Sequence, residues 1–370
     1  MNEDKLKIII SGGGTGGHIF PAVAIANAIK KIKPDSSILF IGAEDRMEMQ
    51  RVPQAGYEII GLPIKGFYRK QLWKNIEVLW KILKSLSKAK KVIKNFQPDV
   101  VIGVGGFASG PTLKMAERLH IPTLIQEQNS YAGVTNKLLA KGASKICVAY
   151  QGMDRFFPAE KIILTGNPVR QDLLQSTYSK EDAKRSYNLD PNKPTVLIVG
   201  GSLGAQSINK CLLNSVEKME NSNIQYIWQT GKIYIDRIRK AVEGKSLKNI
   251  IITDFISDMA QAYAAADMIV SRAGAGSISE FCLLEKPVLL VPSPNVAEDH
   301  QTKNALALVN QKAALYVKDT ELNEKLMPTI HSTITDKHLL QQLSNNIKTL
   351  ALSDSANIIA HEILKLANKE

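Results

Sequence analysis

The sequence is poor in cysteine, in closely spaced metal ligands and in long apolar runs. Its 370 residues include three cysteines and six histidines. Neither residue type recurs as Cys-x-x-Cys or His-x-x-x-His, so we expect reduced, buried thiols and no bound metal. No apolar run reaches the roughly 18 residues that a membrane span needs. The N-terminus also lacks the basic, apolar and small-residue segments of a signal peptide, which predicts a cytoplasmic protein.

Acidic residues are scarce in the first half of the chain. Residues 1–168 contain 24 Lys and Arg against 13 Asp and Glu, a net charge of +11, whereas residues 169–370 contain 23 against 22. Between Lys65 and Lys94 there are ten basic residues and a single acid, Glu77. A local field of this kind suits a polyanion or an anionic membrane surface.

Four β-branched, strand-like runs lead directly into glycine-rich turns and helix-like stretches, at residues 6–17, 99–111, 195–205 and 267–276. This order is typical of a parallel α/β sheet. Because two such units fall in each half, we predict an α/β protein with two doubly wound, Rossmann-like domains that face a central cleft. The break at 166–169 predicts domains 1–168 and 169–351, and an amphipathic helix within 352–370 closes the second domain or crosses back onto the first. Ligands are expected beyond the carboxyl ends of the strands.

The first glycine turn carries the clearest candidate chemistry. Gly12, Gly14 and Gly17 fit G-x-G-x-x-G, but the acidic ribose-binding residue of a dinucleotide site is missing after the second strand. The turn is therefore interpreted as an open loop for a bulky anion, with a plain tight turn as the alternative. His18, at the start of the following helix, is a candidate base that accepts a proton from a sugar hydroxyl, or else a helix-start residue that binds the backbone.

Polar residues after the other strands have both functional and structural interpretations. Glu127 and Asn129 point into the cleft, or Asn129 caps a helix. Ser202 holds a diphosphate or caps a helix, or does both. Glu280 binds a ribose, or forms a capping box with Ser277. Gln301 contacts sugar hydroxyls, or belongs to a solvated helix start.

The segment from residue 72 to residue 84 is predicted to be an amphipathic helix. Its apolar face holds Leu72, Ile76, Leu79, Trp80 and Leu83, with Trp73 beside them and lysines on the flanks. Such a helix is typical of binding to an anionic bilayer surface. The alternative is a helix that packs this face on the core.

Several motifs in order along the chain resemble the MurG family of bacterial peptidoglycan glycosyltransferases. They are Gly13-Gly14-Thr15-Gly16-Gly17-His18, Gly105-Gly106-Phe107-Ala108-Ser109-Gly110-Pro111, Gln126-Glu127-Gln128-Asn129, Gly166-Asn167-Pro168-Val169-Arg170, Gly200-Gly201-Ser202-Leu203-Gly204-Ala205, Asp254-Phe255-Ile256 and Ser277-Ile278-Ser279-Glu280. The resemblance implies a glycosyltransferase B-type fold, with a C-terminal helix that packs back on the first domain. It also implies inverting transfer of N-acetylglucosamine from UDP-N-acetylglucosamine to lipid I, forming lipid II, without a cofactor or metal.

The resemblance further implies roles for individual residues. His18 is the candidate base. The residues expected to bind UDP-N-acetylglucosamine are Thr15, Gly16, Gly17, Asn129, Arg170, Ser202, Ile256, Ala275, Gly276, Ser277, Glu280 and Gln301. Those expected on the acceptor side are Gly14, Gly105, Gly106 and Glu127. The first domain is then the one that faces the acceptor and the membrane, at the cytoplasmic face of the inner membrane, and the second binds the UDP-sugar.

Three other hypotheses stay open from the sequence. One is a different lipid glycosyltransferase that uses a UDP-sugar. Another is a nicotinamide-dependent dehydrogenase built on the first glycine turn. The last is a non-enzymatic polyanion binder that uses the basic stretch between Lys65 and Lys94, although under the preferred interpretation no nucleic acid is expected as a partner.

Overall fold

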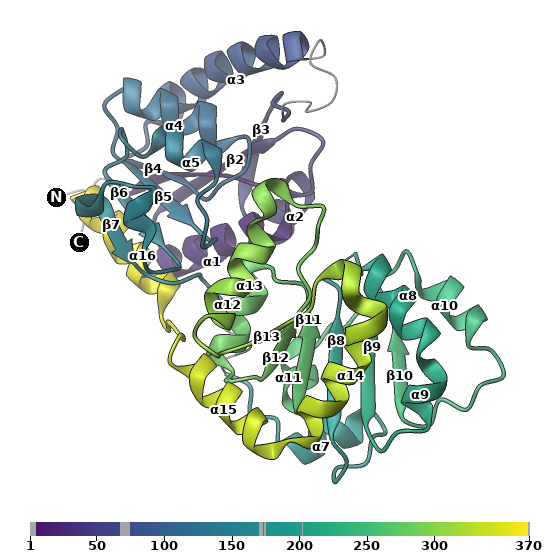
Figure 1. Ribbon diagram of the computed structural model, residues 1–370. Helices are drawn as coiled ribbons and strands as arrows, with labels where there is room; N and C mark the ends of the chain where they lie inside the picture. The colour runs from purple at the N-terminus through teal and green to yellow at the C-terminus, as the bar shows by residue number, and fades with distance from the viewer. Residues whose placement is uncertain (1–4, 67–74, 170–172, 174, 202, 369–370) are drawn as a thin grey trace. The chain divides into compact units, whose positions relative to one another are not determined.

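The computed structural model describes residues 5–66, 75–169, 173, 175–201 and 203–368. The chain forms two compact units, the first comprising Met1–Arg170 with Leu352–Glu370 and the second comprising Gln171–Ala351. Each is built on a parallel sheet with helices on its faces (Figure 1). The predicted fold class, with two doubly wound α/β domains, is therefore confirmed.

The sheet of the first unit runs in the order β3-β2-β1-β4-β5-β6-β7 among the described residues, with every pairing parallel. Its strands are β1 (Lys7–Ser11), β2 (Ser37–Ala43), β3 (Glu58–Leu62), β4 (Val100–Gly103), β5 (Thr123–Glu127), β6 (Lys145–Val148) and β7 (Ile162–Leu164). The order reverses between β1 and β4, which makes that junction a topological switch point where ligands bind in open α/β sheets.

Helices cover both faces of this sheet because alternate strand residues point to opposite sides. Ile8 and Ile10 belong to an apolar core with α1 and α16, whereas Ile9 and Val101 belong to a core with α3, α4 and α5. The helices of this unit are α1 (Gly16–Ile32), α2 (Glu48–Gln54), α3 (Asn75–Phe96), α4 (Ser109–Arg118), α5 (Val134–Leu139) and α16 (Ser355–Leu366). Figure 1 shows α16 beside α1, so the chain returns to its first unit at its end.

The sheet of the second unit runs in the order β10-β9-β8-β11-β12-β13 in the part of the chain that is described, again with parallel pairings. Its strands are β8 (Thr195–Val199), β9 (Gln225–Gln229), β10 (Ile250–Thr253), β11 (Met268–Ser271), β12 (Val288–Leu290) and β13 (Leu315–Tyr316). Its helices are α7 (Lys180–Ser186), α8 (Gln206–Asn214), α9 (Val216–Glu220), α10 (Ile235–Ala241), α11 (Met259–Ala265), α12 (Ala275–Leu283), α13 (His300–Val309), α14 (Leu322–Thr335) and α15 (Lys337–Lys348). Here the switch point lies between β8 and β11.

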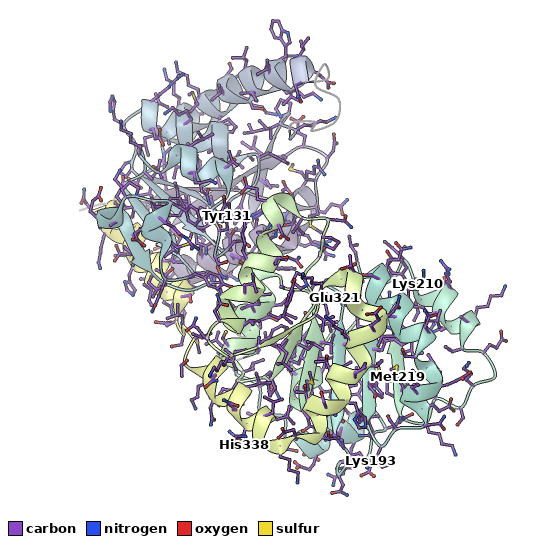
Figure 2. The ribbon with its side chains drawn as sticks, in the orientation of Figure 1. Tyr131, Lys193, Lys210, Met219, Glu321 and His338 are labelled. Carbon is purple, nitrogen blue, oxygen red and sulfur yellow. The ribbon has the colours of Figure 1, made fainter. Side chains whose placement is uncertain are left out.

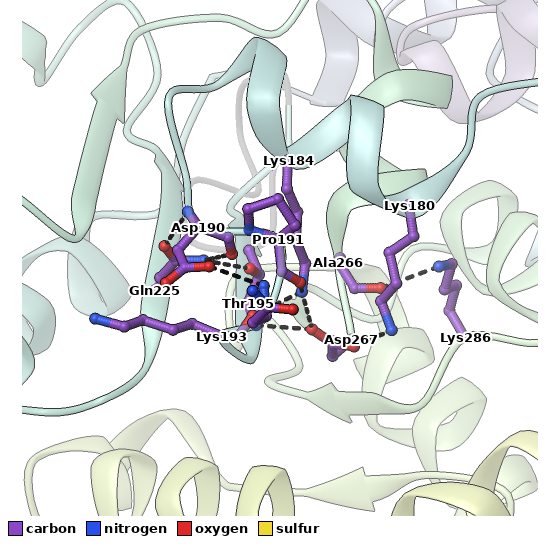
Figure 3. A network of polar contacts seen from close by, with 11 residues as sticks. Lys180, Lys184, Asp190, Pro191, Lys193, Thr195, Gln225, Ala266, Asp267 and Lys286 are labelled. Carbon is purple, nitrogen blue, oxygen red and sulfur yellow. Dashed lines mark hydrogen bonds and ion pairs between the residues drawn. The ribbon is translucent and has the colours of Figure 1, made fainter.

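A polar network closes the amino end of β8 and β11 (Figure 3). The Asp267 carboxylate accepts the Thr195 N–H at 2.8 Å and the Lys184 Nζ at 3.0 Å, and it also pairs with Lys180. Burial alone would raise the pKa of Asp267, but hydrogen bonds from Lys180 and Lys184 outweigh it and hold the pKa below its usual value. Nearby, burial lowers the pKa of Lys286 to about 8, and its Nζ donates to the Ala266 carbonyl at 3.0 Å. The glycine loops leave the sheet at the opposite, carboxyl end.

The first helix runs from Gly16 to Ile32 and contains Pro21 in its second turn, so the helix lacks the N–H that another residue there would donate to the Gly17 carbonyl. The helix predicted from residue 72 is described from Asn75 to Phe96. All three cysteines are buried and free, as expected, and burial raises the pKa of Cys147 and of Cys282 to about 12.

Candidate functional site

The glycine loop after β1 is folded tightly against the loop after β4 at the switch point of the first unit. Gly13 and Gly14 have φ angles of 144° and 88°, a region that L side chains rarely adopt. The Gly13 N–H donates to the Gly105 carbonyl at 3.3 Å. A Cβ on Gly106 would lie 2.4 Å from the Gly13 oxygen, so this approach requires glycine. The predicted acceptor-side residues Gly14, Gly105 and Gly106 thus lie in two loops in contact.

His18 occupies the first turn of α1, half-buried, with its ring over Gly105. A Cβ on Gly105 would be 2.8 Å from the His18 Nε2 and Cδ2 atoms. Its Nδ1 lies 2.9 Å from the Gly13 carbonyl oxygen. Because a carbonyl can only accept, Nδ1 carries the hydrogen and Nε2 is the basic nitrogen of the neutral ring. The backbone-binding interpretation of His18 is therefore confirmed, and it is compatible with a role as base.

Thr15, Gly16 and Gly17 form the start of α1. Thr15 is the N-cap in an extended conformation, and the first backbone N–H groups of a helix have no acceptor on the preceding turn. The backbone of Gly16 and Gly17 can come close to a ligand because neither carries a side chain. Thr15 and Gly17 are exposed and Gly16 is half-buried.

Glu127, at the end of β5, is only 2% exposed and is bound by its own loop. One carboxylate oxygen accepts from the Asn129 N–H at 3.0 Å, and the other accepts from the Gly133 N–H at 3.0 Å and the Asn136 Nδ2 at 2.8 Å. Glu127 therefore fixes the loop that carries Asn129. The alternative in which Asn129 caps a helix is wrong, because α5 begins at Val134 with Gly133 as its N-cap.

Aromatic contacts hold the other end of this loop. Tyr131, labelled in Figure 2, packs edge-on against Phe156 with ring centroids 4.8 Å apart. The Lys137 ammonium lies 4.8 Å from the Tyr131 centroid, and the Arg155 guanidinium donates to the Ser130 carbonyl at 2.9 Å. The loop between β5 and α5 is thus held by side-chain contacts at both of its ends.

The second unit contains a cavity of about 530 Å³ at the carboxyl ends of β8 and β11. Its walls come from the starts of α8, α12 and α13 and from the loops before them. The lining residues are Gly200, Gly201, Gly204, Ala205, Gln206, Ser207, Tyr234, Ser271, Arg272, Gly274, Ser277, Ser293, Pro294, Asn295, Gln301 and Asp319. Backbone N–H groups at helix starts, with a nearby cation, are suited to phosphate.

The loop from Gly200 to Gly204 depends on glycine at its end. Gly204 has a φ of 78°, and a Cβ there would lie 1.9 Å from the Thr230 carbonyl oxygen. The N-cap of α8 is Ala205. Ser202 itself lies outside the described residues, as do Arg170, Leu72 and Trp73.

Arg272 and Asp319 form an ion pair at the cavity, referred to below as the clamp. The sequence did not indicate this pair. The Arg272 Nη1 donates to the Val291 and Pro292 carbonyls, both at 3.1 Å, and to Asp319. Its Nη2 donates to the Ser207 Oγ at 2.8 Å, and that hydroxyl donates to Asp319 at 2.6 Å. The Arg272 guanidinium thus links the end of β11 to the end of β12, to the first turn of α8 and to the turn before α14. Only the position of Arg272 directly after a strand could have suggested it.

Glu280 lies on α12 and accepts a hydrogen bond from the buried Tyr263 hydroxyl at 2.7 Å. The capping-box interpretation of Ser277 and Glu280 is wrong, because α12 begins at Ala275 with Gly274 as its N-cap. Ser277 therefore lies in the first turn and lines the cavity, whereas Glu280 lies one turn further along. Tyr263 is a second contact that the sequence did not indicate.

Gln301, at the start of α13, both lines the cavity and holds a neighbouring loop, since its Oε1 accepts the Ser293 N–H at 2.8 Å. Of the predicted donor residues in the second unit, Ser277 and Gln301 line this cavity. Ala275, Gly276 and Glu280 lie on the same helix as Ser277 without lining it, and Ile256 is buried in the loop after β10.

The outer face of α3 is apolar and exposed over its first turns. Ile76, Leu79, Trp80 and Leu83 are 54–65% exposed, while Val78, Ser85, Ala89 and Ile93 form the buried face. The alternative in which these four apolar side chains pack on the core is therefore wrong. Among the described residues, no helix combines the length and apolarity required to cross a bilayer.

Comparisons with known proteins agree over the whole chain. Residues 8–148 match the glycosyltransferase family 28 N-terminal domain, and residues 195–359 match the glycosyltransferase family 28 C-terminal domain. The UDP-N-acetylglucosamine--N-acetylmuramyl-(pentapeptide) pyrophosphoryl-undecaprenol N-acetylglucosamine transferase of Bacteroides thetaiotaomicron is 64% identical over 370 residues, which is 100% of both chains. The transferase of the same name from Phocaeicola vulgatus is 65% identical over 99% of this chain and 98% of its own.

Solved structures give the same result. The crystal structure of Acinetobacter baumannii MurG aligns with a TM-score of 0.79 and 28% identity over 97% of this chain and 99% of that one. The S. aureus MnaA–UDP co-structure aligns with a TM-score of 0.69 at 14% identity, over 99% of this chain and 98% of that one. At that identity the second likeness concerns the fold alone.

Proposed function

The chain belongs to glycosyltransferase family 28, and from that premise we propose how its two units perform the reaction of its relatives. The reaction is inverting transfer of N-acetylglucosamine from UDP-N-acetylglucosamine to lipid I, the undecaprenyl-pyrophosphoryl-MurNAc-pentapeptide, which forms lipid II for peptidoglycan synthesis. The observation that carries this conclusion is 64% identity over the full length of a transferase with that name. The dehydrogenase, polyanion-binder and other-lipid-transferase hypotheses are set aside.

The cavity of the second unit is the proposed binding site of the UDP group. Its volume of about 530 Å³ falls in the usual range for small-molecule sites. The starts of α8, α12 and α13 supply N–H groups and positive dipole ends, and Arg272 supplies a cation. These groups are suited to stabilise the negative charge that develops on the leaving diphosphate.

Individual donor contacts remain proposals that follow the family pattern. Glu280, held by Tyr263, is assigned to the ribose hydroxyls and Gln301 to the N-acetylglucosamine hydroxyls. Ser202 is assigned to the diphosphate, and Arg170 and Ile256 to the uracil. In the first unit, Thr15, Gly16, Gly17 and Asn129 are assigned to the donor sugar.

His18 is the proposed base for the acceptor 4-hydroxyl. Its Nδ1–H is bound to the Gly13 carbonyl, which leaves Nε2 as the nitrogen with the lone pair. The hydroxyl proton passes to Nε2, the oxygen forms a bond to the anomeric carbon, and the bond from that carbon to the diphosphate breaks. The glycine loops around His18 let a bulky acceptor approach the backbone.

The test compares wild type and His18→Ala in turnover and in UDP binding. UDP release is measured with UDP-N-acetylglucosamine and a soluble lipid I analogue, and UDP affinity is measured by calorimetry. We expect turnover to fall by about 100-fold or more, the usual contribution of a general base, with UDP affinity nearly unchanged. An equal loss of both would mean that His18 is structural.

The exposed face of α3 is the proposed contact with the cytoplasmic face of the cell membrane. Four large apolar side chains project from its first turns, and Lys84, Lys88, Lys90 and Lys91 are exposed along the helix. Apolar insertion together with attraction to anionic lipid is the usual basis of peripheral binding. The net charge of +11 in residues 1–168 favours the same surface.

This contact is tested by the double variant Trp80→Gln, Leu83→Gln in sedimentation with anionic vesicles. Burial of each side chain contributes on the order of 1 kcal/mol when insertion is partial, so vesicle affinity should fall by about 10-fold or more. The matched control is Leu138→Gln, which replaces a 77% exposed side chain on α5. Vesicle binding that is equal in both variants would refute the assignment.

A further inference from the structure

One peptide group in the first unit connects a buried carboxylate with His18. The N–H of Gly14 donates to the Glu48 Oε2 at 2.8 Å, and the carbonyl of Gly13 accepts from the His18 Nδ1 at 2.9 Å. These two groups are the ends of the same amide, between Gly13 and Gly14. The carboxylate and the imidazole are therefore joined through two hydrogen bonds and one planar peptide unit.

Glu48 occupies a place that is shaped for a carboxylate. It begins α2 and is only 1% exposed. Its other oxygen, Oε1, accepts the Ala43 N–H at 3.0 Å. A Cβ on Gly13 would lie 2.3 Å from the Glu48 Cδ, and a Cβ on Gly42 would lie 2.6 Å from its Cγ, so two glycines make room for this side chain.

The charge of Glu48 is balanced by backbone N–H groups. No ion pair joins it to a Lys, Arg or His among the residues that the structure describes. A buried acid is costly unless its oxygens are hydrogen-bonded, and charge-assisted bonds from N–H groups are among the strong ones. The carboxylate therefore polarises the amides that it binds, including the one that faces His18.

We propose that Glu48 is a positioning residue for the transfer reaction and acts on His18 through the Gly13–Gly14 peptide group. The inference rests on the proposed function, in which His18 is the base. A polarised Gly13 carbonyl is a stronger acceptor, so it holds the Nδ1–H tautomer and directs Nε2 toward the acceptor. It also stabilises the imidazolium that forms when Nε2 takes the hydroxyl proton. Glu48 itself neither gains nor loses a proton.

The stabilisation of imidazolium by Glu48 opposes the effect of the helix dipole. His18 lies in the first turn of α1, where the positive end of the dipole disfavours imidazolium. The turn after β4 and the start of α4 present no ionisable group, and Glu127 after β5 is held by its own loop. On α16, which packs along α1, Glu362 is paired with Lys365 and His361 is exposed. The other ionisable residues of α1 are Lys30 and Lys31, at its far end. Glu48 thus has a hydrogen-bonded path to the base, through the Gly13–Gly14 peptide group.

The experiment measures kcat against pH for wild type, Glu48→Gln and Asp99→Asn with the soluble acceptor. Glutamine keeps the shape and one accepting oxygen but removes the charge. In Glu48→Gln we expect the plateau of kcat to fall by about 10-fold and the acid limb to move about one unit to lower pH, because imidazolium loses its stabilising anion. KM for UDP-N-acetylglucosamine should stay within about twofold.

Asp99 is the matched control. Its carboxylate accepts the Lys7 N–H at 2.7 Å, so it also anchors the backbone of this sheet, but at the amino end. Asp99→Asn should lower stability without moving the acid limb. A Glu48→Gln variant with an unmoved acid limb would show a structural role and overturn the proposal.

Two further results distinguish failure of the proposed base from failure of the proposed role of Glu48. Full turnover in His18→Ala would refute the assignment of His18 as the base. Loss of turnover in His18→Ala with no effect in Glu48→Gln would refute the role of Glu48 alone. If Glu48→Gln does not fold, the proposal is tested instead by ¹⁵N NMR, which identifies the tautomer of His18 in the wild-type protein. The Nδ1–H form supports the proposal, and the Nε2–H form overturns it.

Discussion

Arg272→Gln should weaken binding of UDP while leaving uridine binding almost unchanged. The side chain lines the cavity and is 14% exposed, and its partner Asp319 is 18% exposed. In the variant, the Val291 and Pro292 carbonyls lose a charged donor and Asp319 loses its counterion. The cavity loses its cation in the same change, which affects a diphosphate and not a nucleoside.

The magnitude follows from the contacts that are lost. A net hydrogen bond to a charged group contributes about 1.5–3 kcal/mol, and partial exposure of the pair places the expected cost near the lower value. We therefore expect the free energy of unfolding to fall by about 2 kcal/mol. Loss of the cation and looser anchoring of α8 through Ser207 should reduce UDP affinity by about 10-fold, which corresponds to about 1.4 kcal/mol.

Calorimetric titration with UDP and uridine, together with chemical unfolding, measures both effects. The matched control is Arg185→Gln, which breaks an exposed Arg–Asp pair in the same unit with both side chains at least 64% exposed. That variant should change neither affinity nor stability by more than about 0.5 kcal/mol. If Arg272→Gln weakened UDP and uridine equally, or changed neither, the assignment of the clamp to the diphosphate would be refuted.

Two other variants test the second unit. Tyr263→Phe removes the hydroxyl that donates to Glu280 at 2.7 Å, so UDP affinity should fall about threefold to tenfold. The preference for UDP over 2′-deoxy-UDP should shrink in the same titration, and an undiminished preference would mean that Tyr263 does not hold Glu280 on the ribose. Lys286 has a pKa of about 8 in the folded protein, below its value of about 10.4 in the unfolded chain. Between these two pH values the unfolded state binds more protons than the folded state. The free energy of unfolding should therefore rise by about 2–3 kcal/mol as the pH increases from 8 to 10.5. Lys286→Met should abolish that rise in chemical unfolding, and an identical slope in both proteins would contradict it.

The fold class could be predicted because its signal is local. A buried strand that ends in glycine, followed by a helix, is visible in consecutive residues, as in Lys7–Gly17 and Thr195–Ala205. The pattern recurs because each parallel strand needs a crossover helix and each turn at the carboxyl edge needs glycine. Periodicity also identified the apolar residues of α3 but not their environment. Their exposure depends on the buried face that begins at Val78, and only the packed structure shows which side is covered.

The contacts that were missed join residues far apart in the sequence. Glu48 lies in the polar run from residue 44 to residue 50, which has the composition of a surface turn, yet it is 1% exposed. One partner, Ala43, is five residues away, but the other, Gly14, is 34 residues away and approaches Glu48 only when β1 and β2 pair. Tyr263 meets Glu280 across 17 residues and Arg272 meets Asp319 across 47. No periodicity carries such pairings, because they follow from strand order.

The two units share one topology but differ at the residue that follows the strand beyond the switch point, which is β4 in the first unit and β11 in the second. In the first unit this residue is the fully buried Val104, and the glycines after it bring the backbone under the His18 ring. In the second unit it is Arg272, whose guanidinium lines the cavity. A cation beside His18 would disfavour the imidazolium that a base must form, whereas a neutral residue in the second unit would leave a leaving diphosphate without that countercharge. Under the proposed function, the same loop position thus favours proton transfer in one unit and anion binding in the other.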